Sequence, residues 1–329
     1  MARYLYGAAH EQFPPDDLLR QAVEAEEAGF DGIACSDHFQ PWWEPGESGM
    51  AWVWLGAVGE ATSRVSIGTA VTPALSRYHP ALVAQAWATL EVLFPGRTFL
   101  GVGSGESLNE SPFGADWPPP AVQLVAMEEA LELIRRLFAG ERVTQGGRFK
   151  TKEAYLHTRP ERPPPIYVSA FYKGAAQIAA RFGDGLWTLG DPESAPELID
   201  EYKGACSDAG KEPGEVILQA QFSWASDDEA ALEGARVWKG AQPEEFYTED
   251  WHDPRAMYEH AAAQVSDDDL EEKLIVSSDP DEHADRIRVL EELGATAVCV
   301  MNVSGADPHA AIATYREQVL PQLRVARVR

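Results

Sequence analysis

Side chains suited to proton transfer gather in three short segments of the chain. These are residues 10–12 (His-Glu-Gln), residues 36–42 (Ser-Asp-His-Phe-Gln-Pro-Trp) and residues 103–106 (Gly-Ser-Gly-Glu). Histidine titrates near neutral pH, and burial raises the pKa of a carboxyl group toward the same range. Such a set can supply both the base and the acid of a general acid–base reaction. The chemistry predicted first is therefore proton transfer at a shared site.

Each of these segments follows a short apolar run of the β-strand type. Eight such runs occur along the chain, with amphipathic helical patterns between them. This alternation predicts repeated βα units, and it favours an α/β fold of the closed (β/α)8 TIM-barrel type, as one domain over residues 1–329, over a doubly wound sheet. The predicted strands are residues 4–7, 32–36, 65–70, 98–103, 166–169, 185–188, 216–221 and 297–302. The predicted helices are residues 16–28, 80–93, 122–138, 175–182, 196–209 and 280–293.

The active site of such a barrel is built from the loops that follow the strands, so the three segments are expected to face one another at its mouth. Two further stretches have no place in a minimal barrel. Residues 110–121, after the fourth predicted strand, are rich in proline and aromatic residues, and long loops of this kind commonly cover a site. Residues 243–272, in the C-terminal third, have a helical pattern and are interpreted as a second insertion.

The charge of the chain argues against polyanionic partners. Lys and Arg number 27 and Asp and Glu 53, which gives 27 − 53 = −26, and no basic run occurs. We therefore expect a small-molecule substrate, and neither nucleic acid nor a membrane surface as partner. Cys35, Cys206 and Cys299 are too widely spaced to suggest a disulfide framework or a zinc motif. Because no signal-type or membrane-spanning run is seen, a cytoplasmic location is expected.

A metal-dependent TIM-barrel hydrolase is the alternative from a different class, because Asp, His and Glu on barrel strands commonly bind a metal ion. Such sites generally contain paired histidines at close spacing, and no His-x-His occurs here. The histidines beyond residue 150 lie in predicted helices or insertions; they are His157, His252, His260, His283 and His309. We therefore expect no metal, and we rank the hydrolase below a metal-free enzyme.

Three motifs give the chain a specific resemblance. They are SDHFQPW at residues 36–42, GTAV at 68–71 and FLGVGSGESLNE at 99–110, supported by residues 11–13, 77–78 and 278–282. With these motifs the chain resembles the F420-dependent glucose-6-phosphate dehydrogenase family of the luciferase-like superfamily. The match spans nearly the whole chain, is dense over the first third, and is thin from about residue 139 to 264. The resemblance implies a luciferase-like barrel with the deazaflavin coenzyme F420 across its mouth, and transfer of a hydride between an alcohol or sugar and C5 of that coenzyme.

The resemblance also implies roles for individual residues. His38 matches the family's catalytic histidine, which takes the hydroxyl proton, and Trp42 matches a tryptophan of the active site. Glu106 matches the proton donor to N1 of the deazaflavin, and Glu11 matches a second acidic residue. A cis peptide bond in a bulge would fall at Ala70-Val71. The implied coenzyme contacts are Asp37, Ala70, Val71, Ser104, Gly105, Asn109, Ala170, Phe171, Tyr172 and Lys173, with Lys173 and the following helix N-terminus at the phosphodiester.

The substrate side departs from the family pattern. The three basic residues that hold the sugar phosphate in the family are matched here by Asp191, Thr248 and Lys273, of which only Lys273 is basic. Because an aspartate repels a phosphate dianion, we expect glucose 6-phosphate to be a poor substrate or none. Several tryptophans near the mouth suggest an apolar or sugar-stacking pocket. An FMN-dependent monooxygenase on the same barrel is the alternative within the superfamily, and relatives suggest a homodimer.

Overall fold

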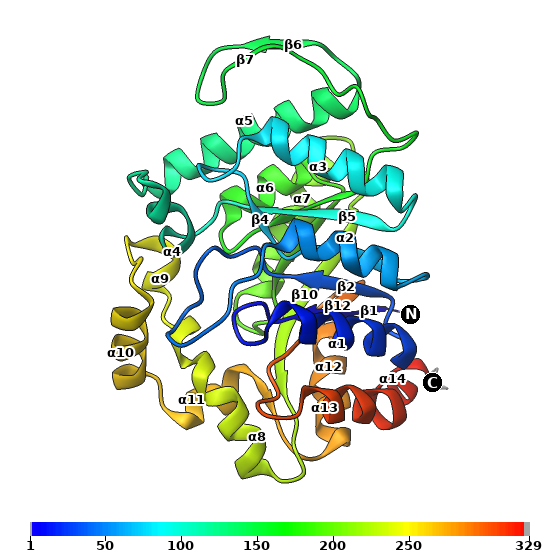
Figure 1. Cartoon of the computed structure of the whole chain (residues 1–329), viewed down its shortest axis with the longest axis vertical. Helices are drawn as coiled ribbons and strands as arrows, with labels where there is room; N and C mark the ends of the chain where they lie inside the picture. The colour runs from blue at the N-terminus through cyan, green and yellow to red at the C-terminus, as the bar shows by residue number, and fades with distance from the viewer. Residues whose placement is uncertain (1, 326–329) are drawn as a thin grey trace.

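Eight parallel strands pair in a closed ring in the computed structural model, which describes residues 2–325 (Figure 1). The ring closes because the strand nearest the C-terminus pairs with both the first strand and the strand before it in the ring. This confirms the predicted (β/α)8 barrel, and each predicted strand lies at its expected place. In ring order the strands are β1 (Arg3–Ala8), β2 (Gly32–Cys35), β3 (Ser66–Thr69), β5 (Thr98–Gly103), β8 (Ile166–Ser169), β9 (Gly185–Leu189), β10 (Glu215–Ser223) and β12 (Ala297–Asn302).

Aromatic side chains fill the interior of the ring. Phe99, Tyr167 and Trp187 come from the neighbouring strands β5, β8 and β9, and the rings of Phe99 and Trp187 stack with centroids 6.1 Å apart. Alternate residues of each strand face outward, where they pack against the helices. The barrel is therefore filled below its mouth, and the loops after the strands rest on a rigid base.

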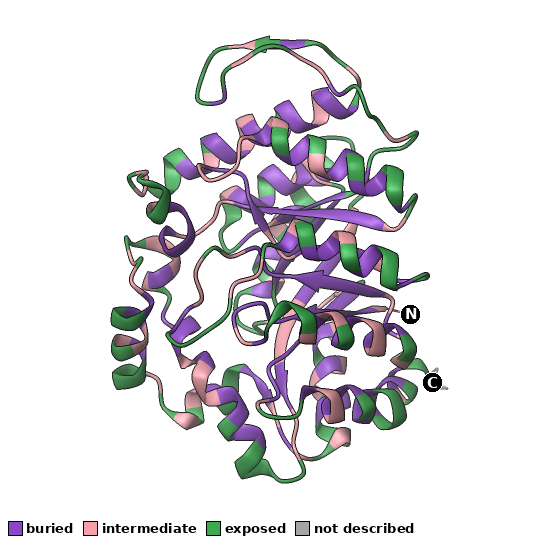
Figure 2. Ribbon diagram, in the orientation of Figure 1, coloured by how far each residue is buried: buried purple, intermediate pink, exposed green. Residues whose placement is uncertain are grey.

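Helices surround the ring with their buried faces turned inward (Figure 2). The six predicted helices are confirmed, and α1 ends as predicted at Gly29, whose φ of 100° is the left-handed conformation that glycine adopts readily. The helices are α1 (Pro15–Ala28), α2 (Ala51–Ala61), α3 (Pro80–Leu93), α5 (Pro120–Phe138), α6 (Lys173–Phe182), α7 (Ala195–Asp208), α8 (Asp228–Ala235), α12 (Pro280–Glu292), α13 (Pro308–Thr314) and α14 (Leu320–Arg324). None of the helices among residues 2–325 is both long and apolar enough to cross a bilayer.

The two predicted insertions differ in detail from expectation. The first, predicted at residues 110–121, begins at the last residue of α4 (Ser107–Glu110) and holds a short 3₁₀ turn and a proline-rich loop that leads into α5. The second is not one helical stretch but a series of short helices, α9 (Glu245–Thr248), α10 (Pro254–Gln264) and α11 (Asp267–Lys273). Four short strands were not predicted: β4 (Thr72–Pro73), the hairpin β6 (Val143–Gln145) with β7 (Thr151–Ala154), and β11 (Ile275–Val276). The hairpin lies outside α5, at the top of Figure 1.

A histidine joins the first and last parts of the chain. His309, at the start of α13, lies 2.6 Å from Glu24 and 3.2 Å from Asp17, both of α1. Although partial burial lowers the pKa of His309, the two carboxylates raise it more, so the net shift is upward. The imidazolium therefore stabilises the fold below the unfolded-state value of 6.5, and this contribution is lost as the pH rises through the raised value.

We expect the His309→Gln variant to lose stability at pH 6 relative to the wild type, by up to about 1 kcal/mol because the group is partly exposed. The difference should shrink toward pH 9. Thermal unfolding of both proteins at the two pH values measures it, and the exposed His157→Gln change serves as control. An equal loss at both pH values would show that the imidazolium is not the source.

Candidate active site

Loops after three strands bring the predicted acid–base residues together at the mouth of the barrel. Glu11 follows β1, His38 follows β2 and Glu106 follows β5. His38 Nδ1 lies 3.4 Å from Glu11 Oε1, and Ser36 Oγ donates a hydrogen bond of 2.8 Å to Glu11 Oε2. The ring of Trp42 lies 5.3 Å from that of His38. The four residues assigned to catalysis by resemblance thus occupy one site.

Burial shifts the proton affinity of these groups strongly. Desolvation raises the pKa of Glu11 to about 7, against the hydrogen bond from Ser36, and the charge of Glu106 adds to the rise. Desolvation likewise raises the pKa of Glu106 to about 7, partly offset by the Asn109 amide. Desolvation and then the charge of Arg77 lower the pKa of His38 to about 3. At neutral pH the site therefore holds a neutral imidazole beside two carboxyl groups that can each hold or release a proton.

Asn109 links two of the loops. Its Oδ1 accepts hydrogen bonds from the backbone N–H groups of Phe39 at 2.7 Å and Gln40 at 3.2 Å. Its Nδ2 donates to Glu106 Oε2 at 3.3 Å. The side chain is fully buried and its amide is already hydrogen-bonded at both ends. Asn109 therefore sets the position of Glu106 relative to the loop that carries His38.

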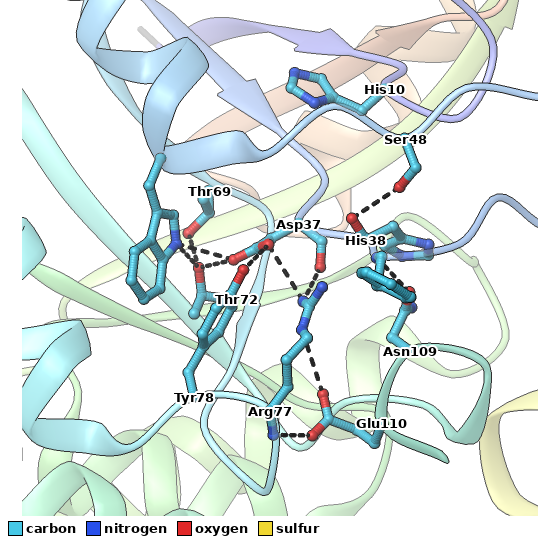
Figure 3. Close-up of polar contacts among 12 residues, drawn as sticks. His10, Asp37, His38, Ser48, Thr69, Thr72, Arg77, Tyr78, Asn109 and Glu110 are labelled. Atoms are coloured by element: carbon cyan, nitrogen blue, oxygen red, sulfur yellow. Dashed lines mark hydrogen bonds and ion pairs between the residues drawn. The ribbon is translucent and has the colours of Figure 1, made fainter. Parts of the chain in front are cut away.

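A second buried network surrounds Asp37 (Figure 3). Its Oδ2 accepts hydrogen bonds from Thr72 at 2.7 Å and Trp52 at 3.0 Å, and its Oδ1 from Arg77 at 3.2 Å and Tyr78 at 3.3 Å. The carboxylate of Asp37, predicted to contact the coenzyme, is thus occupied within the protein. The backbone carbonyl oxygen of Asp37 is occupied as well, because it accepts a hydrogen bond from Arg77.

Arg77 extends the network to the loop after β5. Its guanidinium lies between Asp37 and Glu110, with Nε 3.7 Å from Glu110 Oε1, and only 3% of its side chain is exposed. Glu110 Oε2 in turn accepts from the backbone N–H groups of Ser76 and Arg77. Arg77 is expected from the sequence only as part of a motif, and Glu110 has no expected role. The sequence does hold a signal for this pairing, because an arginine between two β-rich runs needs acidic partners if it is buried.

The bulge expected after β3 is present, and the Ala70-Val71 peptide bond is cis. The neighbouring strand β5 carries glycine where the bulge approaches. A Cβ at Gly101 would lie 2.0 Å from the Thr69 carbonyl oxygen, and one at Gly103 would lie 2.5 Å from the side chain of Val71. Only glycine allows this approach, which places Ala70 and Val71 against the aromatic interior of the barrel.

The segment after β8 leads directly into α6. Ala170 is buried, whereas Phe171 and Tyr172 are exposed, and α6 begins at Lys173 without a side-chain cap. Lys173 forms an exposed ion pair of 2.6 Å with Glu197. Such a pair is weak, so the lysine can exchange its partner for another anion. Ser104 and Gly105 lie partly exposed in the loop after β5, and Gly105 has a φ of 82°.

The residues matched to phosphate binding do not form a cationic cluster. Asp191 accepts hydrogen bonds from Ser194 at the start of α7, and Lys273 lies exposed at the end of α11, near enough to lower the pKa of Asp191. Thr248 Oγ1 points to the Glu245 carbonyl within α9, at 3.5 Å. Sequence reasoning missed Tyr247, whose ring lies 5.3 Å from Trp42 and 5.6 Å from Phe171.

No group of three or more His, Cys, Asp or Glu side chains among residues 2–325 is arranged to hold a metal ion. Glu11, Asp37 and Glu106 instead accept hydrogen bonds from neighbouring side chains. The chemistry available to the described residues is proton transfer beside an aromatic wall.

Comparison with known proteins agrees with this geometry. Residues 3–297 match the family model described as luciferase-like monooxygenase. The F420-dependent glucose-6-phosphate dehydrogenase of Microbacterium testaceum is 39% identical over 98% of this chain and 97% of its own, and that of Beutenbergia cavernae is 40% identical over 98% of each. A solved F420-dependent secondary alcohol dehydrogenase, in complex with an F420-acetone adduct, is 33% identical with a TM-score of 0.94, covering 98% of this chain and 99% of that chain. The chain therefore belongs to the luciferase-like family and, within it, to the group that includes these F420-dependent dehydrogenases.

Proposed function

We propose that the chain is an F420-dependent oxidoreductase that moves a hydride between a small alcohol, or the corresponding ketone, and C5 of the deazaflavin. The observation that carries this proposal is the pairing of a neutral His38 with carboxyl groups whose pKa lies about 7 at the same mouth. Oxidation of an alcohol needs a proton acceptor for the hydroxyl and a proton donor for the reduced coenzyme. The similarity to F420-dependent dehydrogenases supports the same reading.

The residues at the mouth suit this coenzyme. Ala70, Val71, Ser104 and Gly105 offer a backbone surface beside Glu106, and the uncapped start of α6 with Lys173 suits a phosphodiester. The buried Nδ1 of His38 has no hydrogen-bond partner among residues 2–325, and Glu11 Oε1, 3.4 Å away, is the acceptor that would stabilise a proton taken up there. When bound, the deazaflavin supplies a carbon that accepts or gives a hydride.

The protein groups would divide the proton transfers between them. His38 would accept the hydroxyl proton of the alcohol, and Glu106 would hold the proton that the reduced coenzyme requires. Glu11, held by Ser36, would fix the imidazole and share the proton that His38 takes up. Trp42 would shield the reacting carbon from water. Oxidation of the alcohol to a ketone releases one hydride, for which the coenzyme would be the acceptor, and one proton, for which His38 would be the acceptor.

A second candidate is an FMN-dependent monooxygenase, which the description of the matching family favours. Anaerobic fluorescence titrations of the protein with F420 and, separately, with FMN distinguish the two. Micromolar binding of F420 without binding of FMN is expected. Binding of FMN alone would contradict the proposal and assign the chain to the monooxygenases.

We propose that an uncharged secondary alcohol is preferred to glucose 6-phosphate. A phosphate dianion at the matched positions would meet Asp191 instead of a lysine, and like charges cost several kcal/mol. We expect kcat/KM for glucose 6-phosphate to be at least about 100-fold below that for 2-propanol. Initial rates of F420 reduction with each substrate measure this ratio, and comparable values for the two would contradict it. The homodimer suggested by relatives stays a prediction.

A further inference from the structure

We propose that Tyr247, in the insertion after β10, sets the size and polarity limits of the alcohol at the mouth. The inference rests on the proposed function, since it concerns the substrate of the same site. The ring of Tyr247 lies between those of Trp42 and Phe171, at 5.3 and 5.6 Å. Trp42 is itself 5.3 Å from His38. The three rings therefore form a continuous wall that runs from the acid–base pair to the loop before α6.

Tyr247 lies close to the acid–base residues of the site. Its ring contacts that of Trp42, whose own ring lies 5.3 Å from His38, so one side chain separates Tyr247 from the histidine. Burial raises the pKa of the Tyr247 hydroxyl, and the charges of Glu106 and Glu11, which come from different loops, raise it further.

The hydroxyl of Tyr247 already has a hydrogen-bond partner. It donates a hydrogen bond of 2.8 Å to the Ala241 carbonyl oxygen, so the hydroxyl proton is used within the protein. Apart from the hydroxyl, the side chain offers a ligand only the carbon face of its ring. Such a face favours an apolar substituent and gives a phosphate or carboxylate nothing to bind.

Two connections hold the ring in place. Asp250, three residues after Tyr247, accepts hydrogen bonds from Ser107, and from Ser111 at 3.4 Å, near α4. Gln40, in the loop after β2, donates to the His252 carbonyl oxygen at 3.0 Å. Figure 1 shows α9 beside α4 accordingly. Because the segment is fastened to two of the loops that build the site, Tyr247 is a fixed wall, and a fixed wall gives a sharp size limit.

The test compares the ratio of kcat/KM for cyclohexanol to that for 2-propanol in the wild type, Tyr247→Ala and Tyr247→Phe. Removing the ring is expected to raise the ratio by about 10- to 100-fold, in line with the discrimination that one or two carbon groups allow in an apolar pocket. Tyr247→Phe keeps the ring and should keep the wild-type ratio. Tyr155→Ala, in the distant hairpin region, controls for loss of a tyrosine and should leave activity unchanged.

A second readout needs neither turnover nor coenzyme. Saturation-transfer NMR of cyclohexanol with the full-length protein alone should show tighter binding to Tyr247→Ala than to the wild type, and unchanged binding to Tyr247→Phe. If the wild type binds F420 but oxidises no alcohol, the proposed function fails and the NMR comparison still decides the role of Tyr247. An unchanged preference in Tyr247→Ala, or the same change in Tyr247→Phe, would overturn the inference.

Discussion

Replacing Glu106 by glutamine is expected to lower kcat for alcohol oxidation by about 10²- to 10⁴-fold, the range for loss of a positioned general acid. The amide keeps the shape of the side chain and its contact with Asn109, but its N–H protons are not acidic, so it cannot act as a general acid. Binding of F420, followed by fluorescence, should change by only a few-fold. A loss of rate without a loss of binding would assign Glu106 to the chemical step.

The pH dependence gives an independent check on the same residue. Burial raises the pKa of Glu106 to about 7, so its protonated fraction falls as the pH rises through neutrality. Alcohol oxidation by the wild type should therefore decline on the alkaline side, and this decline should be reduced in Glu106→Gln. Glu132→Gln, on the exposed face of α5, is the matched control. Wild-type kcat in Glu106→Gln would remove Glu106 from the mechanism.

Replacing Arg77 by methionine is expected to lower the free energy of unfolding by about 3–5 kcal/mol, the cost of leaving buried charges without their partner. The change leaves the buried carboxyl groups of Asp37 and Glu110 without their positively charged partner. Burial already raises the pKa of both carboxyl groups, and the positive charge of Arg77 opposes that rise. Without Arg77 both groups are expected to hold protons more tightly in the folded chain.

The sign of the pH effect follows from this shift. A folded-state pKa above the unfolded value gives stability at low pH and costs stability as the pH rises. The loss in Arg77→Met should therefore be larger at pH 8 than at pH 5, which urea unfolding at both values measures. Arg255→Met, an exposed arginine paired with Asp253, should change the unfolding free energy by less than about 0.5 kcal/mol. Equal stability of Arg77→Met and the wild type would show that the network does not hold the loops.

The barrel could be predicted from the sequence because its strands are short apolar runs bounded by turn residues. Helix α2 could not be predicted, because residues 51–61 are apolar on nearly every face and lack helical periodicity. The apolar side chains are therefore no guide to the buried face, and Val53 is 71% exposed although Leu55 is buried. The β6–β7 hairpin was missed for the opposite reason, because its strands are short, mostly exposed or half-buried, and mostly polar.

The candidate site, like the fold, could be predicted from the sequence only in part. Glu11, His38 and Glu106 could be located because each directly follows a strand, and barrel topology brings such positions together. Tyr247 could not be located in this way. The local sequence of an irregular insertion does not indicate which of its aromatic side chains lies at the mouth. The partners of Arg77 depend on three loops that only the folded chain brings into contact.

Residues 250–252 are hydrogen-bonded to the loops after β2 and β5, so two distant parts of the chain build the mouth. The barrel loops of the N-terminal third carry the proposed proton-transfer groups, whereas a late insertion supplies the Tyr247 ring beside Trp42. On the proposed function, mutations in that insertion are expected to alter what enters without touching the proton-transfer groups. The architecture is in this sense modular, and it gives evolution a way to diversify substrates on one unchanged redox scaffold.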